Sequence, residues 1–130
     1  LRSNIEQKIK QLNLLNSVSF LGLQKNLTKL YSNTDFLIQG SFVEGFPNAV
    51  LEALSFGIPC LIFEAPGGHN ELIIEGFNGM IIKDSDNLTE LINNFVTFSW
   101  NRELICDDAH KRFNSSKILN QYEDVLKKAL

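Results

Sequence analysis

Residues 36–63 read FLIQGSFVEGFPNAVLEALSFGIPCLIF, and this stretch decides the fold. The apolar run before Gly40 is typical of a buried strand, and the Pro-Asn turn after it opens a strongly apolar helix that ends before Gly57. The run IPCLIF then indicates a second strand. Strand, helix and strand in this order, with continuous apolar strands, favour a parallel sheet covered on both faces. We therefore predict an α/β protein with a doubly wound parallel sheet.

The sequence before this stretch predicts two helices and a strand. Apolar residues at helical spacing predict an amphipathic helix over residues 2–14. The segment SVSFLG, residues 17–22, alternates between polar and apolar side chains and stops at a glycine, which predicts a short strand. Asn26 stands where it can cap a brief helix over residues 27–31.

The sequence after this stretch predicts one more strand and then helices only. NGMIIK, residues 78–83, is a third apolar run bounded by polar residues. From Asp86 onward, apolar residues recur at helical spacing in three groups. We expect alternating strands and helices over residues 1–85 and a helical tail over residues 86–130, within a single domain.

Composition limits the classes of function. The chain has 130 residues, 44% hydrophobic and 21% charged, as in one ordinary soluble domain. Its net charge is -3 without a basic cluster, which argues against nucleic-acid binding. No apolar run reaches the roughly 18 to 20 residues of a membrane span, and the N-terminus lacks a signal-peptide pattern, so we expect a cytoplasmic location. Cys60 and Cys106 are interpreted as core thiols, and no metal site is expected.

The Pro-Asn turn has features of an anion-binding site. In open parallel sheets, ligands bind at the carboxyl ends of the strands. Glu44 lies a few residues beyond such an end, and Gly45 permits close approach of the backbone. Pro47 suits the first position of the helix, and the free N–H groups that follow, near Asn48 to Val50, would attract an anion such as a phosphate.

Two glutamates flank this turn. Glu52 lies one turn into the predicted helix, on the polar stripe shared with Asn48 and Ser55, while Glu44 precedes the turn. Carboxylates accept hydrogen bonds from paired hydroxyls, so two of them beside an anion site fit a nucleotide sugar. Acidic residues are also favoured in the first turns of any helix by the helix dipole. Spacing alone therefore leaves open whether these are binding residues or ordinary surface residues.

The stretch EGFPNAVLEALSFGIPCLIFEAPGGHNELIIEGFNGMII, residues 44–82, resembles the donor-binding part of retaining glycosyltransferases of the GT-B fold, the group 1 class (family 4) that builds bacterial surface polysaccharides and related glycans. The resemblance rests on Glu44 and Glu52 with seven residues between them, the EGFPN turn, LEAL followed by GIP, and the EGFNG turn. It also includes the Gly-Gly pair with Glu71 shortly after it.

This resemblance implies a Rossmann-like half of a GT-B fold and a role for each residue of the turn. Glu44 would contact hydroxyls of the transferred sugar and is the residue assigned to the catalytic site, as a positioner of the sugar. Glu52 would hold the ribose, backbone amides of the turn would face the diphosphate, and the base would lie against the loop after SFLG. The implied donor-binding residues are Glu44, Gly45, Phe46, Pro47, Asn48, Ala49, Val50, Glu52, Gly22 and Leu23.

Four further residues match the family with less specific roles. Gly67 and Gly68 would shape the backbone near the phosphates, although turn geometry alone explains them. His69 could reach the sugar or the acceptor, or serve only at a helix start. Glu71 matches the family's acidic position after the glycine pair, and we interpret it as a support for the start of a helix in preference to a ligand contact.

The resemblance implies a retaining hexosyltransferase that uses a UDP- or GDP-sugar as substrate, needs no metal or other cofactor, and acts on a glycan or lipid-linked acceptor. The alternative is a noncatalytic nucleotide-sugar-binding or assembly domain. Sugar-phosphate epimerases of similar architecture are a weaker alternative because they lack the glutamate pair.

The chain also departs from the family. The family's domain begins with two further strands and a basic Arg-Lys pair, and nothing in this chain matches them. The N-terminal domain with the acceptor site is missing too, so we expect a donor-binding fragment that is inactive alone, with any membrane-surface association residing in that other half. Without the two strands the sheet would have open edges, and we predict that the isolated chain closes the gap by rearrangement or forms a dimer.

Overall fold

The computed structural model describes residues 1–83 and 86–129, with the side chains of His69 and Ala129 outside the description. Its sheet has three parallel strands in the order β1 (Leu37–Gln39), β2 (Cys60–Phe63) and β3 (Gly79–Ile82). All three were predicted as continuous apolar runs. The helices are α1 (Arg2–Gln11), α2 (Thr28–Ser32), α3 (Asn48–Ser55), α4 (His69–Leu72), α5 (Leu88–Thr97), α6 (Arg102–Arg112) and α7 (Ser115–Ala129).

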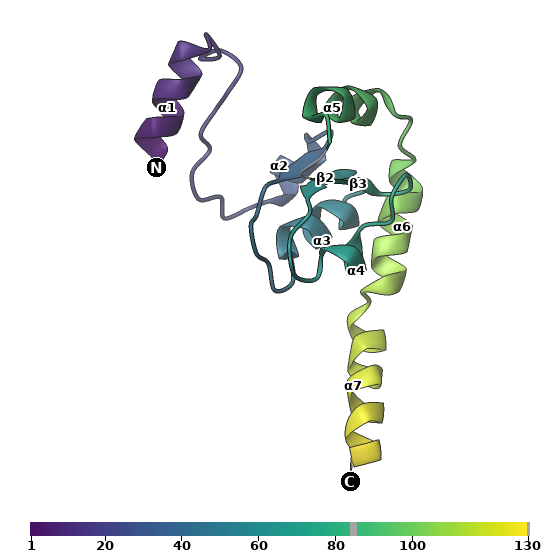
Figure 1. The fold of residues 1–130 in the computed structure, drawn as a ribbon. Coiled ribbons are helices and arrows are strands. Elements are labelled where there is room, and N and C mark those ends of the chain that lie inside the picture. The colour runs from purple at the N-terminus through teal and green to yellow at the C-terminus, as the bar shows by residue number, and fades with distance from the viewer. Residues whose placement is uncertain (84–85, 130) are drawn as a thin grey trace.

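Helices cover both faces of the sheet. Successive residues of β2 point to opposite sides, so each face contributes side chains to a different core. Cys60 and Ile62 lie in a core with residues of α3 and α6, while Leu61 lies in a second core with Phe95 of α5. Both cores are fully buried around β2, and Figure 1 shows the sheet between α3 and α5. The predicted doubly wound α/β class is confirmed.

The predicted strand at residues 17–22 is wrong. This segment has no strand structure, and its apolar side chains Val18, Phe20 and Leu21 are 40%, 42% and 55% exposed. A strand exists only by pairing its backbone with a neighbour, and within the described ranges the sheet consists of β1, β2 and β3 alone. In Figure 1 this segment stays with α1, apart from the sheet.

The open edge expected from the sequence is present at β1. Among the described strands β1 pairs only with β2, so its other edge has no neighbour in the part of the chain that the structure describes. The gap is therefore not closed by rearrangement within these residues. Dimerisation, the other expected outcome, stays a prediction.

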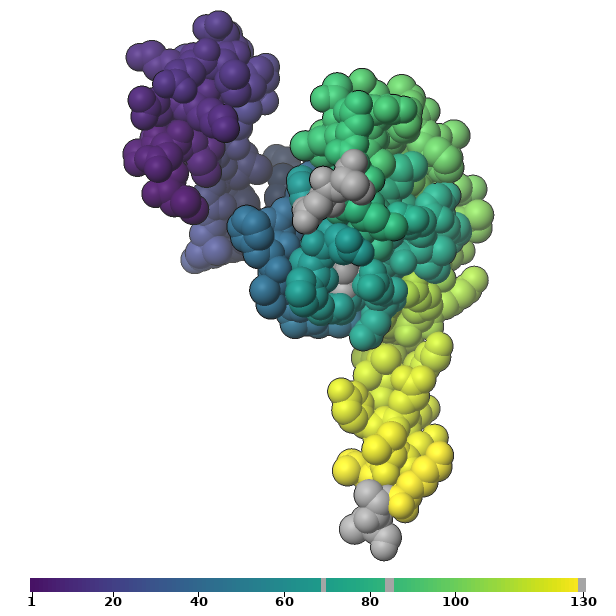
Figure 2. All heavy atoms as spheres, viewed as in Figure 1, coloured from purple at the N-terminus to yellow at the C-terminus, as the bar shows by residue number. Residues whose placement is uncertain are grey.

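Helix α7 projects from the body of the molecule (Figures 1 and 2). Its apolar residues Leu119, Tyr122, Val125 and Leu126 are each more than 60% exposed. Across the described ranges, every helix is too short or too polar to span a membrane.

Candidate functional site

The turn that joins β1 to α3 follows the carboxyl end of the sheet's edge strand. β1 ends at Gln39, and α3 begins at Asn48. Pro47 lies one residue before the helix rather than at its first position, because its backbone angles, φ -79° and ψ 82°, are not helical. The amide of Asn48 donates to the Phe46 carbonyl at 2.9 Å, and that of Val50 donates to the Pro47 carbonyl at 3.0 Å. The expectation of free amides is therefore wrong at these two positions, since the tight turn satisfies them internally.

Glu44 is held by two neighbours from the end of β1. Its Oε1 atom accepts a hydrogen bond of 2.6 Å from the Ser41 hydroxyl and one of 2.9 Å from Nε2 of Gln39. The carboxylate is half-buried, and the Gln39 amide that supports it has its own Oε1 buried without a partner among the described residues. A half-buried carboxylate that accepts from two donors has a defined orientation. The sequence pattern did not reveal Gln39 or Ser41 as supports.

Glu52 is held from another element. Its Oε2 atom accepts a hydrogen bond of 3.1 Å from the Tyr31 hydroxyl of α2. Tyr31 is 8% exposed, and its ring stacks on Phe56 with 5.3 Å between ring centroids. Burial, and then the hydrogen bond to Glu52, raise the pKa of Tyr31 to about 12, so the phenol keeps its proton and remains a donor. Tyr31 was predicted only as part of a brief helix.

An open cavity of about 410 Å³ lies beside Glu52. Its lining combines the Glu52 carboxylate with two aromatic rings, a lysine, a leucine and two small polar side chains, supplied by Lys25, Asn26, Leu27, Thr28, Tyr31 and Phe56. These groups offer an acceptor for hydroxyl groups, a positive charge and an aromatic face for a planar ring. Gly22 and Leu23, which the resemblance assigned to the base, are both exposed and precede these lining residues in the chain.

The glycine pair lies against the turn that carries Glu44. The Glu44 amide donates to the Pro66 carbonyl at 3.2 Å, and the Gly68 amide donates to the Gly45 carbonyl at 3.0 Å. Gly67 has φ +132°, and a Cβ atom there would collide with the Glu44 carbonyl. Only glycine fits this backbone and this close approach. The two loops are therefore held together through their main chains.

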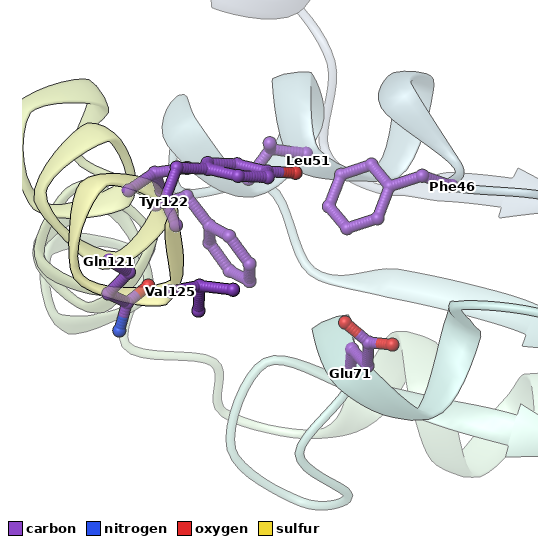
Figure 3. Close-up of a pocket in the computed structure, with 8 residues that line it drawn as sticks. Phe46, Leu51, Glu71, Gln121, Tyr122 and Val125 are labelled. Atoms are coloured by element: carbon purple, nitrogen blue, oxygen red, sulfur yellow. The ribbon is translucent and has the colours of Figure 1, made fainter. Parts of the chain in front are cut away.

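A second hollow, of about 570 Å³, separates the turn from α7. Figure 3 shows Phe46 and Glu71 on one side of it and Tyr122 and Val125 of α7 on the other. Glu71 is exposed and lies in the single turn of α4, the place where it was expected as a helix-start support. His69 was expected to reach the sugar or the acceptor, or to serve only at a helix start. Its side chain lies outside the described residues.

The structure thus separates the predicted residues into two groups. Glu44 lies with Gly45, Gly67 and Gly68 where the two loops meet. Glu52 faces α2 and the cavity beside it. Glu44 and Glu52 flank the Pro-Asn turn in the sequence, and their carboxylates accept hydrogen bonds from different residues.

Residues 1–112 match the family described as glycosyl transferases group 1. The chain belongs to this family. Among its curated relatives, N-acetyl-alpha-D-glucosaminyl L-malate synthase of Bacillus anthracis is 30% identical over 93% of this chain and 33% of its own length. An alpha-1,4-N-acetyl-D-galactosaminyltransferase of Campylobacter jejuni, whose name specifies a diphosphoundecaprenol-linked glycan, is 30% identical over 98% of this chain and 35% of its own.

Two solved structures share the fold. HepE of Anabaena in complex with UDP-glucose is 26% identical, with a TM-score of 0.82 over 97% of this chain and 36% of that one. The apo lipopolysaccharide outer core galactosyltransferase WaaB, at 21% identity, has a TM-score of 0.87 over 98% of this chain and 38% of that one, and shows the fold alone. The chain spans about a third of the length of these two curated relatives. The predicted family and GT-B fold are confirmed.

Proposed function

We propose that this chain forms the donor-binding part of a glycosyltransferase whose donor is a UDP- or GDP-sugar. One observation carries the proposal: two glutamates with seven residues between them each receive a hydrogen bond from a fixed donor, on the two sides of one turn. The family supports it, as do the structures of HepE bound to UDP and to UDP-glucose. The name of one relative, a Vi polysaccharide biosynthesis protein of Salmonella typhi, also supports a role in polysaccharide synthesis.

Each part of the donor has a group in this chain to receive it. Glu52, kept in one orientation by Tyr31, would accept hydrogen bonds from the ribose hydroxyls, with the base in the cavity lined by Lys25 and Phe56. Glu44 would accept from hydroxyls of the transferred sugar. The diphosphate would lie near the first turn of α3, where the helix dipole favours negative charge. The amides of Asn48 and Val50 already donate to carbonyls within the turn, so binding there would require them to donate to the phosphate as well.

The proposed reaction transfers a hexosyl group with retention at the anomeric carbon. The bond from that carbon to the diphosphate breaks, the diphosphate leaves with the electron pair, and the acceptor hydroxyl forms the new bond on the same face while its proton passes to the leaving diphosphate. Glu44 contributes orientation, since a sugar held in position needs less reorganisation to react. The proposal involves no metal or other cofactor, and the nucleotide sugar is a substrate.

The acceptor is proposed to be a glycan or a lipid-linked sugar held by a further domain. We propose a cytoplasmic location, at the inner membrane face where the acceptor is lipid-linked. Names of relatives with diphosphoundecaprenol acceptors support this choice.

The proposal is tested with the full protein in two steps. Calorimetric titration with UDP, GDP, ADP and glucose 1-phosphate should show binding of UDP or GDP and none of the sugar phosphate. Consumption of the matching nucleotide sugar with a diphosphoundecaprenol-linked acceptor is then followed by chromatography, and NMR gives the anomeric configuration of the product. Binding without consumption across lipid-linked and glycan acceptors would favour the noncatalytic module, and binding of no nucleotide would refute the proposal.

A further inference from the structure

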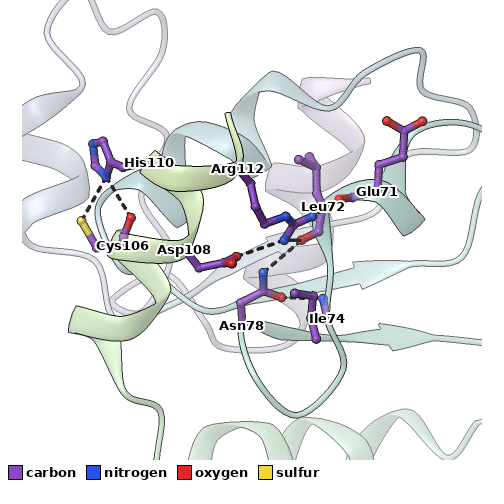
Figure 4. A network of polar contacts seen from close by, with 8 residues as sticks. All are labelled: Glu71, Leu72, Ile74, Asn78, Cys106, Asp108, His110 and Arg112. Atoms are coloured by element: carbon purple, nitrogen blue, oxygen red, sulfur yellow. Dashed lines mark hydrogen bonds and ion pairs between the residues drawn. The ribbon is translucent and has the colours of Figure 1, made fainter. Parts of the chain in front are cut away.

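Arg112, the last residue of α6, joins that helix to α4 (Figure 4). Its Nη1 atom donates to Oδ2 of Asp108 at 3.0 Å and to the Leu72 carbonyl at 3.3 Å, and its Nη2 atom donates to the Glu71 carbonyl. The Arg112 side chain is 27% exposed, so these bonds are partly shielded from water. One guanidinium therefore spans an acidic residue of its own helix and the last two carbonyls of another.

Helix α4 depends on such external partners. It has four residues, too few to be stable by itself, and the carbonyls at its C-terminal end have no partners within the helix. A cation near that end is favoured by the dipole, and the planar fork of arginine can reach two carbonyls at once. Asn78, which is buried, also donates to the Leu72 carbonyl at 3.0 Å and accepts from the Ile74 amide at 2.7 Å. Two side chains thus fix the C-terminal end of α4.

The N-terminal end of α4 follows residues 66–68, which contact the loop that carries Glu44. Pro66 and Gly68, just before the helix, bond to the main chain of Glu44 and Gly45. Gly67 lies so close to the Glu44 carbonyl that a Cβ atom at residue 67 would collide with it. A displacement of α4 would therefore be passed to the backbone of Glu44 through two hydrogen bonds and one tight contact.

We propose that Arg112 is a positioning residue for the donor sugar: it fixes α4 and, through residues 66–68, the backbone of Glu44. This inference rests on the function proposed above. Arg112 acts through α4 and not by contact with the donor. Glu52 is held independently, by Tyr31 on α2, so the loss of Arg112 should disturb the sugar end of the donor and spare the nucleoside end.

The binding test compares nucleotide with nucleotide sugar in the full protein. UDP and UDP-glucose, or GDP and GDP-mannose if the wild type prefers guanine, are titrated by calorimetry into wild type, Arg112→Met and Arg112→Lys. Arg2→Met is the matched control, because Arg2 also bonds an acidic residue four positions away on its helix, but on the exposed α1. Arg112→Met should weaken the sugar conjugate about tenfold and the bare nucleotide less than about twofold, since a small misplacement of a positioned group is costly.

Arg112→Lys should recover part of the loss, because lysine keeps the charge but not the fork. Arg2→Met should change neither affinity. Equal weakening of nucleotide and conjugate by Arg112→Met would overturn the proposal, because it would assign Arg112 to general stability. No change in either affinity would overturn it as well.

A second test needs no nucleotide. Hydrogen–deuterium exchange by mass spectrometry should show faster exchange in peptides over residues 41–47 and 64–70 of Arg112→Met, with β2 and β3 unchanged. If Arg112→Met does not fold, Asp108→Asn replaces it, because that variant removes the ion pair that orients the guanidinium. Unchanged exchange in both peptides would refute the positioning role. A wild type that binds no nucleotide would defeat the proposed function, while this exchange result would still decide whether Arg112 fixes the loop.

Discussion

The Tyr31 hydroxyl of α2 donates a 3.1 Å hydrogen bond to Oε2 of Glu52 on α3, and the two residues are 21 positions apart in the sequence. The phenol is buried while the carboxylate is exposed, so a rigid donor holds an acceptor that still faces solvent. This arrangement gives Glu52 a fixed orientation beside the 410 Å³ cavity. An ordinary surface glutamate has no such support.

Replacing Tyr31 with phenylalanine tests the function of this bond. Tyr31→Phe keeps the ring stacked on Phe56 but removes the donor, so the affinity for UDP or GDP should fall about fivefold, as expected for one hydrogen bond of about 1 kcal/mol. Tyr122→Phe is the control, because Tyr122 is 68% exposed on α7. Calorimetry on the full protein gives both affinities. An unchanged affinity in Tyr31→Phe would show that the bond has no role in nucleotide binding.

The same tyrosine predicts a loss of stability at alkaline pH. Burial and Glu52 raise the pKa of Tyr31 from 10.0 to about 12 in the folded chain. Because the folded pKa lies above the unfolded one, the protonated phenol stabilises the fold fully below pH 10, and this contribution is lost as the pH rises through 12. Urea unfolding between these pH values should show a steeper decline in the wild type than in Tyr31→Phe. Parallel declines would contradict the assignment.

Gly67 should resist substitution. Gly67→Ala places a Cβ atom against the Glu44 carbonyl at a φ of +132°, and we expect a loss of about 2 kcal/mol in the free energy of unfolding. Gly40→Ala is the control, because a Cβ there meets only the Phe63 ring at ordinary contact distance, 3.5 Å. Urea denaturation measures both. Equal stabilities of the two variants would show that the loops do not need this contact.

The open edge of β1 should pair with a second copy when the 130-residue chain is made alone. Sedimentation velocity should show a dimer, and Ile38→Lys, a charge on a half-exposed residue of β1, should convert it to a monomer. Leu119→Lys, on the distant α7, is the control and should leave the dimer intact. A monomeric wild-type chain at high concentration would refute this prediction.

The sheet was predictable because its signal is local. Each strand is an apolar run, and the Pro-Asn turn and the glycines mark where the chain changes direction. Residues 17–22 carry a similar local signal yet form no strand, because a strand also needs a neighbouring backbone that these residues do not have. The local pattern of apolar residues shows that a segment is able to form a strand. Backbone pairing with a neighbouring strand decides whether the strand is present.

The candidate site was predictable only in part, for the same reason. The glutamate pair and the glycine pair are visible as short motifs. The groups that orient them are not, because Tyr31 is far from Glu52 in the sequence and Arg112 bonds carbonyls 40 and 41 positions away. Every residue has a backbone carbonyl, so the sequence does not distinguish the two carbonyls that Arg112 binds. No motif could therefore have identified Arg112.

The most direct test of the central claim is a titration of the full protein with UDP and UDP-glucose, or the guanine pair, in wild type, Glu44→Gln and Glu52→Gln. Glu103→Gln, an exposed residue of α6, serves as the control. Glu52→Gln should weaken binding of nucleotide and conjugate alike, and Glu44→Gln should weaken binding of the conjugate alone. If neither variant differs from Glu103→Gln for any nucleotide, the two glutamates are surface residues and the proposed donor site is wrong.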